Sequence, residues 1–98
     1  MTEFIDKYVL SDTTTTSPAI ASLGPLYIAW KGDGNDNLNL MYSTDYGRTF
    51  QGKFTFPETT PLPPALCAHN GKLILAWRGD GKEQLDVAQV DIQDRTIQ

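Results

Sequence analysis

Two short loops of the sequence gather the side chains that could bind a ligand. Each loop follows a tryptophan and combines a cationic side chain with carboxylates, and the first loop adds amides. Carboxylate and amide groups bind hydroxyl groups, and an aromatic ring beside them offers a platform for a sugar ring. The candidate ligand-binding residues are Trp30, Lys31, Asp33, Asn35, Asp36, Trp77, Arg78, Asp80 and Glu83. Because both tryptophans end apolar segments, packing in the interior is favoured over a ligand-stacking role for them.

Other reactive groups predict neither a metal site nor a catalytic centre. The segment 33–37 places oxygen donors at alternate positions, as a calcium loop does, but Leu38 stands where that loop needs glycine. A plain hairpin loop is therefore expected. His69 is the only histidine and lies beside an Asn-Gly turn, and Cys67, the only cysteine, is expected to be a buried thiol. We expect no metal, no cofactor and no catalytic residue.

The elements that position these loops belong to an internal repeat. Ala29–Gly34 reads Ala-Trp-Lys-Gly-Asp-Gly and recurs as Ala76–Gly81, with Arg78 in place of Lys31, at an offset of 47 residues (76 minus 29). Upstream, residues 4–18 match residues 50–64 at an offset of 46, so the second copy holds one added residue near His69. Self-similarity at such a period is typical of repeat architectures. We therefore treat residues 1–98 as one unit of two repeats, about 4–49 and 50–98.

Each repeat is expected to form short strands separated by turns. Two runs, Leu26–Trp30 and Leu73–Trp77, are apolar at every position, which suits strands covered on both faces. Segments rich in Thr, Ser and Pro, 11–17 and 57–63, are expected to be extended linkers. No segment shows helical periodicity, so the sequence predicts an all-β fold. The expected strands are 4–10, 19–23, 26–30, 38–42, 50–56, 65–69, 73–77 and 85–90.

Four strands in a repeat of 40 to 50 residues is the size of a β-propeller blade. In that arrangement the strand 4–10 is an outermost strand, and the last blade lacks its own. We therefore expect the strand 4–10 to complete a blade of a neighbouring chain, so that the chain binds copies of itself. Head-to-tail contacts close into a ring of six blades from three chains, which we favour, or of eight from four. The other interpretation is that the chain is a piece of a longer propeller.

The turn between the repeats carries a recognisable motif. Ser43, Asp45, Gly47, Thr49 and Phe50 follow the spacing Ser-x-Asp-x-Gly-x-Thr-aromatic. Asp45 can accept hydrogen bonds from the backbone of the turn, and Gly47 supplies a positive φ. The motif resembles the Asp-box of sialidases and other repeat propellers. That resemblance implies a structural role for these five residues, on the face of the propeller away from the active site.

A sialidase-type hydrolase is disfavoured by the sequence. The resemblance implies an arginine triad and a Phe/Tyr-Arg-Ile-Pro motif, but the chain has only three arginines and lacks that motif. Arg48 and Arg95 stand at equivalent turn positions, and symmetric copies do not provide the differently tuned groups of acid–base catalysis. A non-enzymatic recognition module is therefore expected, similar in plan to small oligomeric propeller lectins, with a protein-interaction scaffold as the alternative.

Charge and hydropathy limit the partners further. The formal net charge is −4, and the eight basic residues form no cluster, which disfavours nucleic acid and anionic membranes. The first residues lack a basic and then apolar leader, and no apolar run approaches 18 residues. A cytoplasmic location is the default expectation, and the expected partners are other copies of the chain and a glycan.

Overall fold

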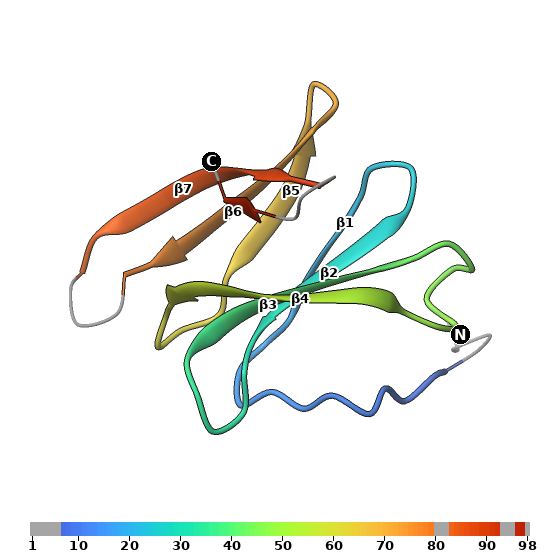
Figure 1. Ribbon diagram of the computed structural model, residues 1–98, viewed down its shortest axis with the longest axis horizontal. Helices are drawn as coiled ribbons and strands as arrows, with labels where there is room; N and C mark the ends of the chain where they lie inside the picture. The colour runs from blue at the N-terminus through green and yellow to red at the C-terminus, as the bar shows by residue number, and fades with distance from the viewer. Residues whose placement is uncertain (1–6, 80–82, 93–95, 98) are drawn as a thin grey trace, which may run out of the picture.

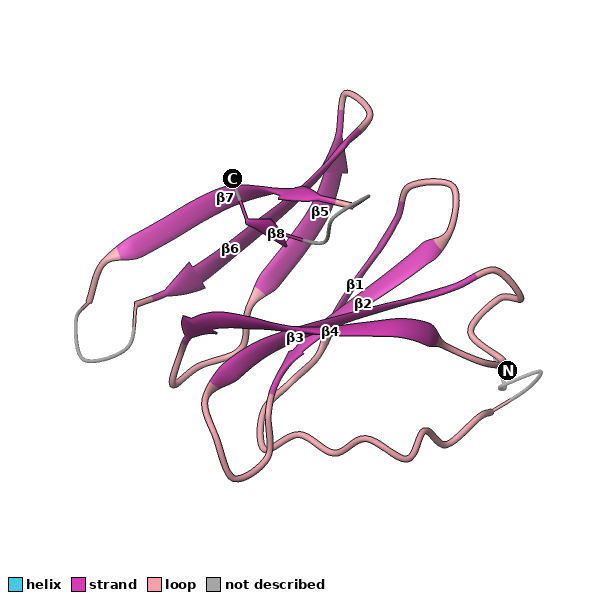
Figure 2. Cartoon of the chain, in the orientation of Figure 1, coloured by secondary structure: helices cyan, strands magenta, loops and turns pink. Residues whose placement is uncertain are grey.

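The computed structural model describes residues 7–79 and 83–92, together with the backbone of residues 96 and 97. The chain forms two antiparallel sheets and, among the described residues, no helix (Figures 1 and 2). The first sheet has the order β1 (Ala19–Ser22), β2 (Leu26–Lys31), β3 (Asn37–Ser43) and β4 (Gln51–Thr59). The second has β5 (Ala65–His69), β6 (Lys72–Arg78), β7 (Leu85–Asp91) and the two-residue β8 (Thr96–Ile97). The all-β prediction is confirmed.

Seven of the expected strands form close to their expected bounds, and β4 is the one that differs most. It runs to Thr59 and so includes Pro57, which the sequence placed in a linker. Proline is tolerated here because β4 is an edge strand and its pairing with β3 is irregular between Asn37 and Asn39. At this irregularity the Asn37 side-chain amide donates to the Phe56 carbonyl at 2.9 Å, which replaces a ladder hydrogen bond.

The added residue of the second repeat is accounted for by its first hairpin. The β1–β2 ladder has four residue pairs and a three-residue loop around Gly24, which has a φ of 73°. The β5–β6 ladder has five pairs and a two-residue loop, Asn70–Gly71, with φ values of 49° and 76°. Positive φ at both loop positions matches the tight turn that suits the twist of paired strands. The longer ladder and the shorter loop together add one residue.

The hydrophobic core lies between the two sheets. Strand alternation gives each sheet an inward face, which packs on the other sheet, and an outward face. On the inward face of the first sheet the core residues are Tyr27, Ala29, Leu38, Leu40 and Phe56. On the inward face of the second sheet they are Leu73, Leu75, Trp77, Ala88 and Val90. A continuous apolar layer therefore lies between the two sheets and holds them together.

Residues 7–18, which we name the N-terminal segment, form no strand. The segment runs in an extended path beside the first sheet before it enters β1 (Figure 1, blue). The strand 4–10 was expected to pair with a neighbouring chain, so its pairing stays a prediction, and residues 4–6 lie outside the described part. No helix in the described part is long and apolar enough to cross a membrane.

Candidate functional site

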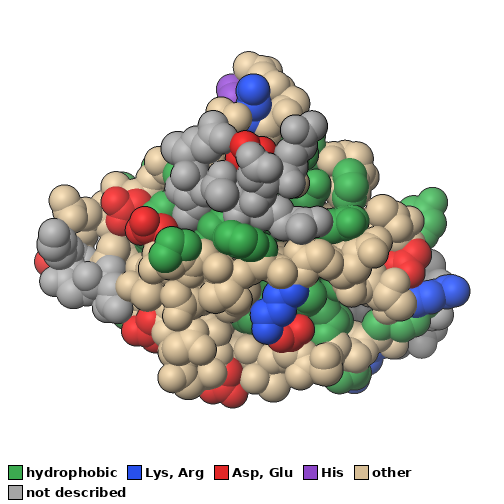
Figure 3. Space-filling view, in the orientation of Figure 1, with side chains coloured by type: hydrophobic (Ala, Val, Ile, Leu, Met, Phe, Trp, Pro, Cys, Tyr) green, Lys and Arg blue, Asp and Glu red, His purple; other side chains and the backbone are tan. Residues whose placement is uncertain are grey.

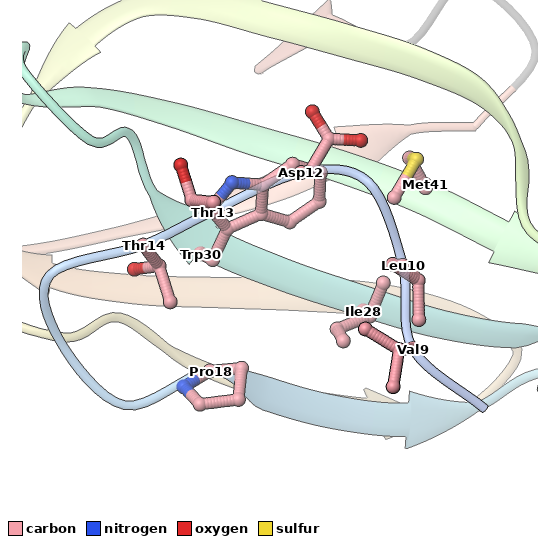
Figure 4. A pocket seen from close by; sticks show the side chains of 9 residues that line it. All are labelled: Val9, Leu10, Asp12, Thr13, Thr14, Pro18, Ile28, Trp30 and Met41. Carbon is pink, nitrogen blue, oxygen red and sulfur yellow. The ribbon is translucent and has the colours of Figure 1, made fainter. Parts of the chain in front are cut away.

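The N-terminal segment and the outward face of the first sheet enclose a groove with two halves. The first half is an apolar hollow of about 290 Å³ between the segment and strands β2 and β3. Figure 4 shows Val9 and Leu10 beside Ile28, with the ring of Trp30 next to Thr13. The lining residues are Val9, Leu10, Asp12, Thr13, Thr14, Pro18, Ile28, Trp30 and Met41. This half of the groove can therefore bind the apolar face of a ligand.

The second half is a polar hollow of about 240 Å³ that shares Asp12, Thr13 and Trp30 with the first. The loop between β2 and β3 contributes Asp33 and Asn35 to it. Strands β3 and β4 contribute side chains that carry an amide, a cation and a hydroxyl. The lining residues are Ser11, Asp12, Thr13, Trp30, Gly32, Asp33, Asn35, Asn39, Lys53 and Thr55. Donors and acceptors of hydrogen bonds therefore surround this half.

Side-chain contacts fix the N-terminal segment over the first sheet. The Lys53 ammonium forms an ion pair with Asp12 at 2.7 Å. The Thr13 hydroxyl donates to Asp33 at 3.0 Å, and the Thr14 hydroxyl donates to the Lys31 carbonyl at 2.7 Å. Because these partners come from β2, β4 and the β2–β3 loop, the polar half is held from three sides. Exposed ion pairs and hydrogen bonds are individually weak, so these contacts position the segment but allow it to dissociate from the sheet.

The loop between β2 and β3 is held in shape by its own side chains. Lys31 forms an ion pair with Asp36 across the loop at 3.1 Å, and the backbone N–H of Asn37 donates to the Asn35 side-chain oxygen at 3.0 Å. Gly32 leaves room for this contact, because a Cβ there would lie 2.5 Å from the Asn35 oxygen and would displace the Asn35 side chain. With that oxygen occupied, the Asn35 amide nitrogen is the group that can donate toward the groove.

Near Trp30, buried polar groups complete the wall of the groove. The amide of Asn39 is 5% exposed; it donates to the Asn37 carbonyl at 3.2 Å and accepts from the Thr55 hydroxyl. The Lys53 ammonium lies 5.9 Å from the centre of the Trp30 ring, within the range of a cation–π contact. Trp30 itself is largely buried, so it lines the groove but is not an exposed platform.

The predicted site residues divide into two groups. Trp30, Asp33 and Asn35 meet in the groove, and Lys31 and Asp36 form the ion pair that braces the loop beside it. Trp77 lies in the core between the sheets, where a ligand cannot reach it, as expected from the packing alternative. Arg78 ends β6, Glu83 lies in the loop before β7, and Asp80 lies outside the described residues. The two loops therefore do not form equivalent sites in the single chain.

Sequence reasoning missed six side chains that line the polar half: Ser11, Asp12, Thr13, Asn39, Lys53 and Thr55. The repeat gave one usable signal, because Asp12 corresponds to Glu58 and Thr13 to Thr59, at the end of a strand that borders the β2–β3 loop. That signal indicated only that the strand expected at 4–10 is followed by polar side chains. It did not indicate that the segment would lie over its own first sheet.

The turn that resembles an Asp-box forms the expected hydrogen bonds. Asp45 accepts from the Thr49 hydroxyl at 2.6 Å and from the Thr49 backbone N–H at 2.9 Å, and Ser43 donates to it at 2.7 Å. These hydrogen bonds, those from Thr49 first, lower the pKa of Asp45 from 3.8 to about 2. Gly47 has a φ of 88°, as its place in the motif requires, and Phe50 is half-buried beside it. None of the five motif residues lines either of the two hollows of the groove.

Two reactive side chains lie on the second sheet and outside the groove. Cys67 is exposed, so the prediction of a buried thiol is wrong for this chain. The reason is that Cys67 pairs with Ile74 on the outward face of the second sheet, which no described element covers. His69 is exposed at the tip of this sheet, 3.3 Å from the Asn70 amide (Figure 3, purple). Within the described part of the chain, no three His, Cys, Asp or Glu side chains are grouped as metal ligands.

Comparison of the chain with protein-family models, with curated proteins and with solved structures gives no match.

Proposed function

We propose that the chain is a non-enzymatic recognition module that binds a carbohydrate in the groove beneath the N-terminal segment. The observation that carries this proposal is the junction of an apolar and a polar hollow at one tryptophan, Trp30. A sugar ring has a face of C–H groups and an edge of hydroxyls, so it needs both kinds of surface side by side. An amphipathic aromatic wall next to carboxylate and amide groups meets that need.

The size of the groove favours one or two sugar units. The two hollows measure about 290 and about 240 Å³, at and just below the lower end of ordinary small-molecule pockets, about 300 Å³. In the polar half, Asp33 can accept from sugar hydroxyls, and the Asn35 amide can donate to them. Asp12 is already paired with Lys53, which leaves the second oxygen of its carboxylate for the ligand.

The proposed architecture is a pair of β-propeller-type blades. It is supported by the repeat, by two antiparallel sheets of the same strand order that pack face to face, and by the hydrogen-bonded turn at Asp45. A non-enzymatic role is favoured because neither carboxylate of the groove is arranged for catalysis. Asp12 is neutralised by Lys53, and Asp33 accepts a hydrogen bond from Thr13, so no nucleophile faces a general base.

The test is a titration of the isotope-labelled chain with a panel of neutral, acidic and amino sugars, followed by NMR. Binding should shift the amide signals of Gly32, Asp33 and Asn35. Asp33→Asn removes a charged acceptor, so affinity should fall about 10-fold to 100-fold, as expected for a hydrogen bond to a charged group of about 1.5–3 kcal/mol. Glu58→Gln is the matched control, because it removes an exposed carboxylate that does not line the groove.

Two outcomes would count against this proposal. Shifts confined to the second sheet, or equal affinities of Asp33→Asn and Glu58→Gln, would remove the groove as the site. Turnover of a sialoside or of any other glycoside by the chain would contradict the non-enzymatic role.

A protein-interaction scaffold is the second candidate. It is favoured by the outward face of the second sheet, where Leu85 and Val87 are largely exposed. Exposed apolar side chains that lie together on one sheet face are typical of an interaction surface.

A further inference from the structure

The two sheets of the chain pack through unlike faces of the same repeat. At the offset of 47, Leu75 and Trp77 on the inward face of the second sheet correspond to Ile28 and Trp30. Those two residues lie on the outward face of the first sheet. The inward face of the second sheet and the outward face of the first are therefore the same face of the repeat, which we name face A.

The opposite faces show the same relation. Leu38 and Leu40, on the inward face of the first sheet, correspond to Leu85 and Val87 on the outward face of the second. We name this face of the repeat face B. The interface inside the chain thus joins face A of the second sheet to face B of the first. Face A of the first sheet and face B of the second remain on the outside, and they are the two halves of one more such interface.

Equivalent apolar residues of the repeat are buried on the inner faces and exposed on the outer faces, so each outer face lacks a sheet that covers it. On face B, Leu38 and Leu40 are 0% and 2% exposed, whereas Leu85 and Val87 are 87% and 68% exposed. On face A, Leu66 is half-buried against the core, whereas its counterpart Ile20 is 57% exposed. The apolar character of the outer positions matches that of the buried ones, because both are built from the same repeat. A surface with the chemistry of an interface is left uncovered.

We propose that face B of the second sheet binds face A of the first sheet of a second copy of the chain, in the geometry of the internal interface. The partner is thus identified by the repeat itself. Each copy carries both halves, so the contact is head-to-tail, and a closed assembly follows where the rotation divides the circle. This inference goes beyond the carbohydrate proposal and does not depend on it.

The N-terminal segment now occupies face A of the first sheet, and its fit is loose. The apolar hollow of about 290 Å³ remains beneath it, and Val9 is 85% exposed. A packed sheet leaves few voids of that size, so the segment covers Trp30 and Met41 without filling the surface. The segment is held by exposed ion pairs, hydrogen bonds and a cation–π contact of Arg48 with Tyr8, beside a loosely packed apolar hollow. Because such exposed contacts are individually weak, a second copy can displace the segment at small cost.

The displaced segment has a place in the assembly. Residues 7–13 correspond to residues 53–59 of β4, the fourth strand of the first sheet. In the second sheet the described pairing of β7 with its fourth strand is limited to Val90 and Asp91, and no described residue pairs with the edge of β7 at Leu85–Gln89 on this side. An open edge of this kind accepts an added strand. Residues 7–13 of the second copy therefore complete this sheet as β4 completes the first.

The connection that such an added strand requires is already formed. After β4, the Thr60 hydroxyl donates to the Leu62 carbonyl at 3.1 Å and accepts from the Leu62 N–H at 3.2 Å before the chain enters β5. Before β1, the Thr14 hydroxyl accepts from the Thr16 N–H at 3.2 Å and lies 3.2 Å from the Thr16 carbonyl, which shares its proton with the Lys31 carbonyl. Thr14 and Thr16 are the counterparts of Thr60 and Leu62 in the repeat. The turn that leads from a fourth strand into the next sheet thus exists at both places.

Assembly and carbohydrate binding compete in this arrangement. The segment that forms the wall of the groove, with Asp12 and Thr13, is the segment that leaves to complete the neighbouring sheet. A sugar that binds the groove should therefore shift the equilibrium toward single chains. The two proposals can fail separately, because the assembly is measured without sugar.

The test is the mass of the full chain by light scattering at about 100 µM, with Val87→Asp as the disrupting variant. The wild type should form a defined assembly, about 33 kDa for three copies of the 10.9 kDa chain. Val87→Asp should remain folded, because Val87 is exposed in the single chain, and should lose the assembly. Tyr46→Asp is the matched control, since Tyr46 is fully exposed on the turn at Asp45 and belongs to neither face, and it should assemble normally.

Amide hydrogen exchange and thiol labelling examine the two parts of the contact. Amides of residues 7–13 should become protected in the assembly, and Cys67 should react about tenfold more slowly with a thiol reagent. A wild-type mass of 10.9 kDa at this concentration would overturn the proposal, as would an assembly that Val87→Asp leaves intact. An assembly in which residues 7–13 exchange as fast as in the single chain would overturn the strand addition.

Discussion

A pair of identical substitutions at equivalent positions of the repeat offers the sharpest test of the packing. Leu38 and Leu85 are counterparts at the offset of 47, yet Leu38 is 0% exposed and Leu85 is 87% exposed. Leu38→Ala deletes buried methyl groups and leaves a cavity between the sheets. Such changes cost about 2–5 kcal/mol of unfolding free energy. Leu85→Ala deletes groups already in water and should change it by less than about 0.5 kcal/mol.

The measurement is urea unfolding followed by tryptophan fluorescence, because Trp77 lies between the sheets and reports their separation. The chain should be kept at about 1 µM, about a hundredfold below the concentration of the assembly test, so that association adds less to the stability. A loss of about 2–5 kcal/mol is a large part of the total stability of a small domain, about 5–15 kcal/mol. Equal effects of the two substitutions would refute the assignment of inward and outward faces.

Further predictions concern the turns. Asp45 has its pKa lowered to about 2, so its contribution to stability is present above its ordinary pKa of 3.8 and is lost as the pH falls from about 4 to about 2. Asp45→Asn should lower the melting temperature at pH 6 and should weaken the dependence of the melting temperature on pH between pH 4 and pH 2.5, both measured by thermal scans. A pH dependence equal to that of the wild type would contradict the hydrogen bonds to Thr49. Gly71→Ala should cost about 1 kcal/mol in urea unfolding because φ is 76° there, although nothing crowds the new Cβ, whereas Asn70→Gly should change stability by only a few tenths.

Much of the fold follows from local patterns. The apolar runs ending at Trp30 and Trp77 and the Gly-Asp-Gly segments after them define two hairpins, because alternation and turn chemistry act over a few residues. The sequence placed Pro57 in a linker because proline disfavours strand interiors, and the irregular edge pairing of β4 overrides that preference. The local conformational preference of Pro57 therefore affected the strand assignment less than the edge position of β4 in the sheet did.

The candidate site was less accessible to sequence reasoning. Asp33 and Asn35 were identified because the loop between β2 and β3 is local, but Asp12 and Thr13 reach the groove through contacts between segments 20 to 41 residues apart. No short pattern encodes where an extended segment lies on a sheet. The exposure of Cys67 has the same origin, because whether an apolar sheet face is covered depends on what packs on it and not on the strand's own residues.

The most direct test of the account is whether the outer faces of two different copies touch each other. Chains with labelled methyl groups, mixed with unlabelled chains, allow contacts between copies to be selected in an isotope-filtered NMR experiment. We expect cross-peaks between Leu85 or Val87 of one copy and Ile20 or Ile28 of another. Cross-peaks that join Val87 to Val87, or a filtered spectrum without contacts between these two faces, would contradict it.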